Sequence, residues 1–295
     1  MRVDACALDL ISPEYSPATS VPCSICDAYV RLNMMFGDTI RLQESLAAAM
    51  RGPRAPGSSR RVVVFAMSTP CLASTGYAVD ADKEVSSGSS LIDAAQEAEV
   101  DHVVYSSVCG CDKESAPSYH KSKFKIEERL KKSGLSYSIL RPVSFLEIWA
   151  RLSQFSNKSI SGLVKGDVKQ QWVALEDVGA CAALALQHEK YKGRTIDLCG
   201  DELSGNDMAK VLTKLRAGST GELIGYKCAW VMRLVIMFFA GSIYQERVAF
   251  QEKGGFEADK TSIRAFSDGY PEEFKRKGAM DFEKFLVRYC VKSFL

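Results

Sequence analysis

The sequence lacks an excess of charge of either sign. Its 38 Lys and Arg residues are nearly balanced by 36 Asp and Glu residues, which leaves a formal net charge of +2. A nucleic-acid-binding protein gathers a basic excess on one face, and this composition provides none. We therefore expect no nucleic-acid partner.

Long apolar runs are also lacking. The most apolar segment, residues 229–244, contains Arg233, and its uncharged part from Leu234 to Tyr244 is shorter than the roughly 20 residues of a transmembrane helix. We expect a buried helix here and no membrane partner. The first residues, MRVDACALDLISPEYSP, are interrupted by acids and prolines, which is unlike a secretory signal. This favours the cytoplasm or the nucleus.

Clustered metal ligands are scarce. The chain has only three histidines, and its closely spaced cysteine pairs, Cys23 with Cys26 and Cys109 with Cys111, lack a second pair at zinc spacing. Several of the ten cysteines lie in apolar runs, where a free thiol behaves as a small hydrophobe. We expect free thiols in a reducing compartment and no metal site.

From about residue 60 the sequence alternates between strand and helix patterns. Continuous β-branched runs predict strands that are covered on both faces, and the charged segments between them predict helices. One of these helical patterns is weakened by its SSGSS run. Short connections between alternating strands and helices predict a parallel sheet with right-handed crossovers. The predicted strands are residues 61–67, 102–108, 135–143 and 194–200, and the predicted helices are residues 79–100 and 118–134, with Gly134 as a stop.

Two further helices are predicted after the third strand. Residues 174–187 form an apolar helical pattern that Asp177 could cap. Residues 204–215 begin with Ser204 and Asp207 at capping-box spacing.

The expected fold class is α/β, with a Rossmann-like parallel sheet, helices on both faces and a small α+β lobe at the C-terminal end. We predict a divergent N-terminal segment with an arginine-rich loop over residues 1–60. The remainder of the Rossmann-like domain is predicted over residues 61–145. Residues 146–295 are predicted to form a substrate-side lobe, interleaved with the last strands of the sheet.

Three residues suggest a catalytic group. Tyr119 and Lys123 are four residues apart, so a helix places them on one face, and Ser106 ends the preceding predicted strand. An adjacent ammonium favours the phenolate form of a tyrosine, which makes the phenol a better acid or base near neutral pH. A serine hydroxyl can hold a carbonyl oxygen during hydride transfer. The alternative interpretation is an ordinary solvated, charged helix, since Y-x-x-x-K is a weak pattern on its own.

Four blocks of the sequence resemble the NmrA-like family, atypical members of the short-chain dehydrogenase/reductase superfamily. Their order and spacing make a chance match improbable. The blocks are GDTIRLQESLAAAMRG, KEVSSGSSLIDAAQEAEVDHVVYSSV, SYHKSKFKIEERLKKSGLSYSILRPVSFLE and VALEDVGACAALALQHEKYKGRTIDLCGDELSGNDMAKVL.

The resemblance implies that the chain binds NADP or NAD. It assigns Lys123 to the ribose and nicotinamide end of the cofactor. Tyr119 occupies the position of the family's usual histidine and of the wider superfamily's catalytic tyrosine. The other implied cofactor contacts are Asp38 near the adenine, Ser68, Thr69 and Pro70 in a loop that follows a strand, and Val143, Ser144 and Phe145 against the nicotinamide.

One departure from the family is large. The family begins with a strand and a G-x-x-G-x-x-G turn, whose backbone amides bind the pyrophosphate at a helix N-terminus. In this sequence the first glycine is Gly37, so the first βαβ unit is degenerate or truncated. We therefore expect weak or absent cofactor binding, unless the start of the gene model is misplaced.

The sequence leaves three functions open. The first is an NAD(P)-dependent oxidoreductase that acts on a small carbonyl, alcohol or enone. The second is a non-catalytic NmrA-type regulatory or redox-sensing protein that binds a protein partner. The third is an inactive fragment, because a sheet without its first βαβ unit keeps an exposed edge.

Overall fold

The structure is a computed structural model, and its described part forms two compact units. The first unit contains the described residues up to Asp112, with Ser118–Arg141 and Ala180–Ile196. The second contains Lys113–Pro117, Pro142–Gly179 and the described residues from Asp197 onward. The predicted division at residues 60 and 145 stays a prediction. The structure describes residues 62–66, 81–151, 159–216, 224–228, 242–258 and 279–290.

The first unit is built on a four-stranded sheet of order β1-β2-β3-β7. The pairs β1–β2 and β2–β3 are parallel, and their register aligns Ala66 with Ser106 and Ser106 with Leu140. The predicted parallel sheet is therefore confirmed. The four strands are β1 (Val62–Ala66), β2 (His102–Ser106), β3 (Tyr137–Pro142) and β7 (Arg194–Leu198).

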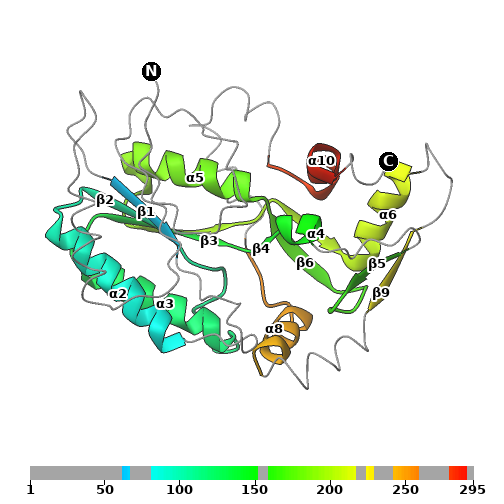
Figure 1. Ribbon diagram of the computed structural model, residues 1–295, viewed down its shortest axis with the longest axis horizontal. Coiled ribbons are helices and arrows are strands. Elements are labelled where there is room, and N and C mark those ends of the chain that lie inside the picture. Colours follow the sequence, from blue (N-terminus) through cyan, green and yellow to red (C-terminus); the bar gives the residue numbers. More distant parts are fainter. Residues whose placement is uncertain are drawn as a thin grey trace. The chain divides into compact units, whose positions relative to one another are not determined.

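Helices cover both faces of this sheet (Figure 1). Helices α2 (Ala81–Glu97) and α3 (Ser118–Lys132) pack against each other on one face. Residues Ala180–Gln187 of α5 (Leu175–Gln187) lie on the opposite face (Figure 1). A short 3-10 turn, η1 (Glu189–Tyr191), precedes β7. The core beneath α2 and α3 includes Leu91, Ile92, Val103, Tyr105, Ile126, Leu130 and Ile139.

Helix α2 continues through its SSGSS run because Gly88 allows a close approach to α3. A Cβ atom at Gly88 would lie 2.6 Å from Cδ1 and 2.8 Å from Cγ1 of Ile126, which is fully buried. The glycine therefore weakens the helix locally and permits the contact between the two helices. The Ser90 hydroxyl donates to the Ser86 carbonyl inside the helix at 3.1 Å.

Replacement of Gly88 by alanine is expected to destabilise the first unit. The new Cβ gains about 1 kcal/mol in helix propensity but overpacks against the branched side chain of Ile126, which costs about 1–3 kcal/mol. Urea unfolding followed by far-UV circular dichroism measures the balance. Ser86→Ala, at an exposed position of α2, is the control for propensity. A stabilised Gly88→Ala variant would contradict the packing argument, and Ile126→Val should relieve part of the loss.

The second unit contains smaller sheets. One has the order β4-β6-β8, with β4 and β6 parallel and β6 and β8 antiparallel; the other pairs β5 with β9 in parallel. The strands are β4 (Ser144–Phe145), β5 (Ser159–Gly162), β6 (Lys169–Val173), β8 (Asp201–Ser204) and β9 (Gly225–Cys228). The helices are α4 (Glu147–Arg151), α6 (Gly205–Arg216), α8 (Ser242–Glu252) and α10 (Phe282–Phe285), which is followed by the π-helical turn η3 (Leu286–Cys290).

An aromatic cluster forms the core of the second unit. The ring centroids of Trp149 and Trp172 are 5.7 Å apart, and those of Trp149 and Phe282 are 6.2 Å apart, both edge-on. All three side chains are buried. These aromatic residues are thus packed core, which connects the chain near residue 280 to α4 and β6.

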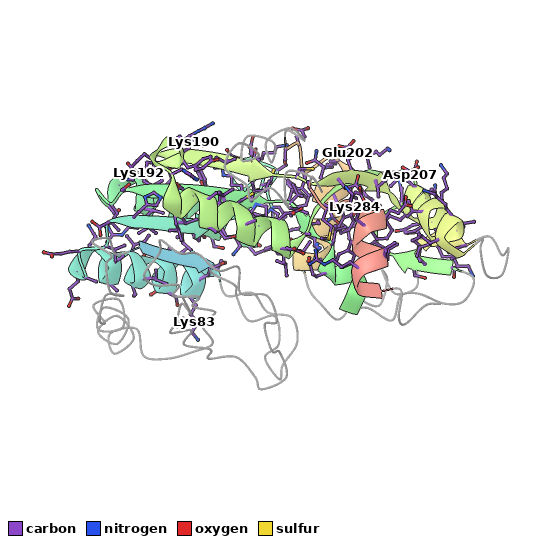
Figure 2. The ribbon with its side chains drawn as sticks, turned by 90° about the horizontal axis from the view of Figure 1, so that it is seen from above. Lys83, Lys190, Lys192, Glu202, Asp207 and Lys284 are labelled. Atoms are coloured by element: carbon purple, nitrogen blue, oxygen red, sulfur yellow. The ribbon has the colours of Figure 1, made fainter. Side chains whose placement is uncertain are left out.

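The predicted start of α6 is confirmed. The Asp207 amide donates to the Ser204 hydroxyl at 3.2 Å, and the Ser204 amide donates to the Asp207 carboxylate at the same distance. Asp207 lies at the beginning of this helix (Figure 2). The reciprocal pair is a capping box.

The expectation that Asp177 caps α5 is wrong. The helix begins at Leu175, whose amide donates to the Glu147 carboxylate at 2.9 Å. Asp177 lies inside the first turn, and its carboxylate accepts a hydrogen bond from the Met280 amide at 2.8 Å. The side chain is therefore used for a long-range contact.

None of the helices in the described ranges is long and apolar enough to cross a membrane. Residues 229–241, which carry most of the apolar segment identified in the sequence, lie outside these ranges.

Candidate functional site

Ser106 is the last residue of β2 and lies at the edge of the sheet where the parallel strands end. Its neighbour Ser107 is buried and continues the pairing, since the Ser107 amide donates to the Leu140 carbonyl at 2.7 Å. In parallel α/β sheets, ligands bind at this carboxyl edge. Ser106 itself is half-buried.

Helix α3 begins one residue before Tyr119 and carries both Tyr119 and Lys123 in its first turns. Both side chains are half-buried. The Tyr119 ring is edge-on to the ring of His120, with centroids 4.5 Å apart. The structure therefore brings the three predicted catalytic residues into the first unit, on β2 and on the helix that packs against it.

Lys123 is engaged by a residue that sequence reasoning missed. Its Nζ lies 2.5 Å from Oε1 of Glu84, in the first turn of α2. The Glu84 side chain is only 1% exposed, and its second oxygen accepts a hydrogen bond from the Ser122 hydroxyl at 2.5 Å. The sequence signal for this role was an acidic residue in the first turn of a predicted helix. That signal is weak, because acids at helix N-termini are common for reasons of the helix dipole alone.

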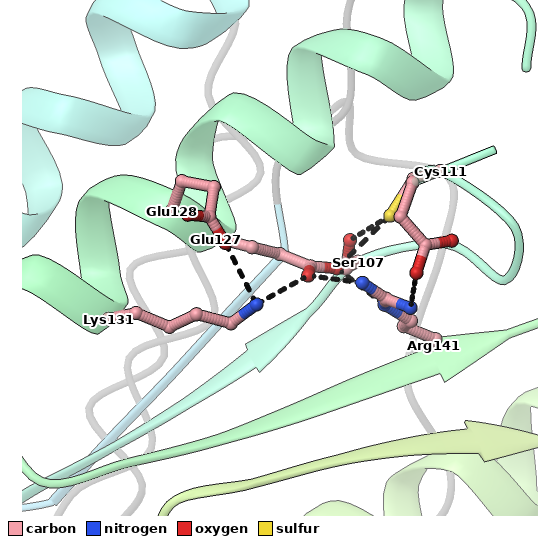
Figure 3. Close-up of polar contacts among 7 residues, drawn as sticks. Ser107, Cys111, Glu127, Glu128, Lys131 and Arg141 are labelled. Atoms are coloured by element: carbon pink, nitrogen blue, oxygen red, sulfur yellow. Dashed lines mark hydrogen bonds and ion pairs between the residues drawn. The ribbon is translucent and has the colours of Figure 1, made fainter. Parts of the chain in front are cut away.

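A second buried network lies between β2, α3 and β3 (Figure 3). Arg141 binds Glu127 through two hydrogen bonds, from Nε at 2.9 Å and from Nη2 at 2.7 Å, and its Nη1 reaches Asp112 at 2.8 Å. Lys131 lies 3.7 Å from Glu127. The two-point contact between Arg141 and Glu127 is the geometry that a guanidinium prefers with a carboxylate.

The same network holds the segment that follows Ser106. The Cys111 thiol donates to Glu127 at 3.2 Å and lies 3.8 Å from the Ser107 hydroxyl (Figure 3). Burial, followed by repulsion from Glu127, raises the pKa of Cys111 to about 12. This thiol is therefore a protonated hydrogen-bond donor at neutral pH, and its role is to anchor the segment between Ser106 and Tyr119.

Tyr105 is a buried phenol on the same strand as Ser106. Desolvation, with further contributions from Glu84 and Glu127, raises the pKa of Tyr105 well above its ordinary value. Both buried carboxylates thus influence one phenol, which stays neutral. Tyr105 belongs to the core and was not predicted as a site residue.

The residues predicted to contact the nicotinamide from the third strand lie in the second unit. The Val143 amide donates to the Leu198 carbonyl at 3.2 Å, and Ser144 and Phe145 form β4. The Ser144 hydroxyl accepts a hydrogen bond from Gln251 at 3.3 Å. Their predicted contact with a cofactor stays a prediction. Asp38, Ser68, Thr69 and Pro70 lie outside the described residues.

Within the described ranges, no group of three or more histidine, cysteine and carboxylate side chains is placed to hold a metal ion. Of the cysteines in these ranges, Cys109, Cys111, Cys181 and Cys199 are buried and Cys228 is half-buried.

Comparison with known proteins identifies the class of this chain. A family model described as the NmrA-like family matches residues 37–286. The chain therefore belongs to the NmrA-like family, and the expected resemblance is confirmed. A curated relative, prestalk A differentiation protein A from Dictyostelium discoideum, is 29% identical over 93 residues. That match covers 30% of this chain and 31% of the relative.

Several solved structures share the fold. Triphenylmethane reductase from Citrobacter sp., complexed with NADP(H), has a TM-score of 0.64 at 16% identity, over 86% of this chain and 82% of the reductase. An NADPH-dependent quinone oxidoreductase from Escherichia coli, complexed with NADPH, has a TM-score of 0.64 at 16% identity, over 88% and 89% of the two chains. NmrA, a negative transcriptional regulator in complex with NADP, has a TM-score of 0.58 at 14% identity, over 91% and 90%. The Rossmann-like α/β fold is thus confirmed.

Proposed function

We propose that this chain is an NAD(P)-dependent oxidoreductase that acts on a small carbonyl compound, alcohol or enone. The observation that carries the proposal is the placement of Ser106 at the end of β2 and of Tyr119 and Lys123 in the first turns of α3. The end of a parallel strand and the start of the helix that follows it share one edge of the sheet. Membership of the NmrA-like family, which includes NADP-bound structures, supports the cofactor class.

Each of the three residues has a distinct role in this proposal. The Ser106 hydroxyl holds the substrate oxygen, and the Tyr119 hydroxyl gives or takes the proton at that oxygen. Lys123 favours the phenolate form of Tyr119 and holds the ribose of the cofactor. NADP or NAD supplies or accepts the hydride when it is bound. Its nicotinamide end would also contact Val143, Ser144 and Phe145, and the rest of the cofactor would contact Asp38, Ser68, Thr69 and Pro70.

The donor set of the first unit fits only part of such a cofactor. A hydroxyl, a phenol and an ammonium suit the carbonyl, proton and ribose chemistry at the nicotinamide end. The ammonium of Lys123, however, already contacts a buried carboxylate. We therefore infer weak cofactor binding.

Thermal unfolding in the presence of NADPH and of NADH tests cofactor binding. A ligand that binds only the folded state stabilises it by about 2.7 kcal/mol at a hundredfold excess over Kd. We expect stabilisation at millimolar cofactor and little at micromolar cofactor. No stabilisation at millimolar concentration would remove the oxidoreductase proposal, and strong stabilisation at micromolar concentration would contradict weak binding.

Replacement of Tyr119 by phenylalanine is expected to lower turnover by about 100-fold or more, since a positioned proton donor contributes about 10²–10⁴ in rate. Oxidation of NADPH with a panel of quinones, aldehydes, ketones and enones measures this effect. Tyr137→Phe is the matched control, because Tyr137 is a half-buried tyrosine on β3. Equal rates for the wild type and the Tyr119 variant would exclude Tyr119 as the proton donor.

A non-catalytic regulatory protein is the second candidate. The contact between Glu84 and Lys123 favours this candidate. A lysine that is paired with a buried carboxylate does less to favour the phenolate form of a neighbouring tyrosine. A regulator of this kind binds a protein partner and responds to cofactor binding without turnover. Cofactor binding together with no turnover across the whole substrate panel would support this second candidate.

A further inference from the structure

Glu84 is a buried carboxylate that joins α2 to the part of α3 that carries Tyr119 and Lys123. Its residue is 3% exposed, its Oε1 contacts the Lys123 ammonium, and its Oε2 accepts from the Ser122 hydroxyl. Both contacts are at 2.5 Å. The two partners are adjacent in sequence and lie within the turn that follows Tyr119.

The environment makes this carboxylate depend on Lys123. An ionised carboxylate that is removed from water is costly unless it has an opposite charge and hydrogen-bond donors. Lys123 provides the charge, and its own side chain is only 15% exposed. The ammonium that the proposed function assigns to the cofactor ribose is therefore already required by the fold.

Ser122 extends this link toward Tyr119. Its hydroxyl lies within hydrogen-bond distance of both the Glu84 carboxylate and the Tyr119 carbonyl, at 2.5 and 2.9 Å. A hydroxyl has one proton to donate, so these two acceptors compete for it. An ionised carboxylate is the stronger acceptor. The charge of Glu84 therefore acts on both the Lys123 ammonium and the Ser122 hydroxyl.

We propose that Glu84 is a positioning residue that holds the Lys123 ammonium against α2 and competes with the cofactor ribose for it. This inference rests on the proposed function, because it assigns a competitor to the residue that would bind the ribose. In this arrangement the site holds its own counter-ion, and cofactor affinity depends on the charge at position 84. The weak binding that we infer then has a cause within the described residues.

The first test is the affinity for NADPH and NADH, measured by isothermal titration calorimetry of the wild type and of Glu84→Gln. Glutamine keeps the shape and an acceptor oxygen but removes the charge. We expect tighter binding by about tenfold, the factor that corresponds to about 1.4 kcal/mol. Unchanged or weaker binding by Glu84→Gln would overturn the proposal.

Asp93→Asn is the matched control for this experiment. Asp93 also lies on α2 and also pairs with a basic residue of α3, Arg129, at 2.5 Å. This pair is partly exposed and remote from Lys123 in the sequence of α3. An equal gain in affinity from Asp93→Asn would show a general charge effect and would contradict a specific role of Glu84.

The second test does not require a cofactor. Amine acylation by acetic anhydride, followed by peptide mass spectrometry, reports how accessible each lysine is. Lys121 and Lys125 are exposed on the same helix and serve as internal standards. Labelling of Lys123 relative to these two should be low in the wild type and should rise in Glu84→Gln. Labelling that does not change would overturn the proposal.

Ser122→Ala provides a second variant if Glu84→Gln folds poorly. It removes one hydrogen bond and leaves the ion pair, so labelling of Lys123 should stay low. High labelling in Ser122→Ala would contradict the dominant role of the carboxylate. If no variant binds cofactor while labelling behaves as expected, then the proposed function fails, and with it the competition with ribose, whereas the restraint on Lys123 stands.

Discussion

Replacement of Arg141 by methionine is expected to cost about 3–5 kcal/mol of stability, the usual effect of leaving one member of a buried ion pair without its partner. Glu127 is fully buried and would lose its two-point contact with the guanidinium. Lys131 lies 3.7 Å away and is a weaker substitute. Hydrogen exchange of the α3 amides, together with urea unfolding followed by circular dichroism, measures the loss in the first unit.

Two variants make this prediction specific. Arg129→Met removes the pair with Asp93, which is 51% and 34% exposed in its two side chains, and should cost only about 0–1 kcal/mol. The double variant Arg141→Met with Glu127→Leu removes both buried charges and should recover much of the loss. A double variant as unstable as the single one would show that the methionine is misfitted. The stranded charge would then be excluded as the cause.

Replacement of Asp177 by asparagine is expected to stabilise the second unit at neutral and alkaline pH. Desolvation raises the pKa of Asp177 from 3.8 to about 6, assisted by Glu176 and Glu147 and opposed by the Met280 amide and Lys284. Lys284 lies on α10 (Figure 2). This increase in pKa corresponds to a penalty of about 3 kcal/mol for the ionised form of Asp177 in the folded state, because one pKa unit is about 1.36 kcal/mol. Asparagine retains an acceptor for the Met280 amide and avoids this penalty.

The sign of the pH dependence follows from proton uptake. Between pH 4 and pH 6 the folded state holds a proton on Asp177 that the unfolded state has released, so this group makes stability fall as pH rises through that window. The advantage of Asp177→Asn should therefore be absent near pH 4 and nearly complete above pH 7. Urea unfolding followed by tryptophan fluorescence measures this advantage, because Trp149 and Trp172 are packed in the core of the second unit.

Asp207→Asn is the control with the opposite sign. Hydrogen bonds from Ser204, followed by that from Lys169, lower the pKa of Asp207 below its ordinary value. Its ionised form therefore stabilises the fold above pH 4, and that contribution is lost as pH falls. The loss caused by Asp207→Asn should shrink on acidification. If both variants shift stability in the same direction at every pH, then a general change of surface charge explains them and the Asp177 argument is wrong.

Local patterns in the sequence predicted the elements well where the interactions are local. The strand at His102–Ser106, the helix at Ser118–Lys132 and its stop at Gly134, with φ of 79°, are all found. The capping box of Ser204 and Asp207 is also found, because both partners lie within one turn. Membership of the NmrA-like family was predictable for the same reason, since its motifs are short and contiguous.

Long-range partners were not predictable. Glu84 and Lys123 are 39 residues apart, and Asp177 and Met280 are 103 residues apart. A carboxylate in the first turn of a helix is explained equally well by the helix dipole or by a cap, and only packing decides which of its neighbours it meets. Gly88 is a similar case, because the side chain that leaves no room for a Cβ atom at this position is Ile126, which lies on another helix.

The sequence by itself determined the order of the strands and helices, the family, and the residue types at the end of β2 and the start of α3, because these depend on hydrophobic periodicity and short motifs. Only the tertiary structure decided what those residues contact. It pairs Lys123 with the buried carboxylate of Glu84, and it makes Arg141, Glu127 and Cys111 the anchor of the segment after Ser106. The physical reason is that a buried charge requires a partner, and the packing of the helices against the sheet decides which groups are buried together.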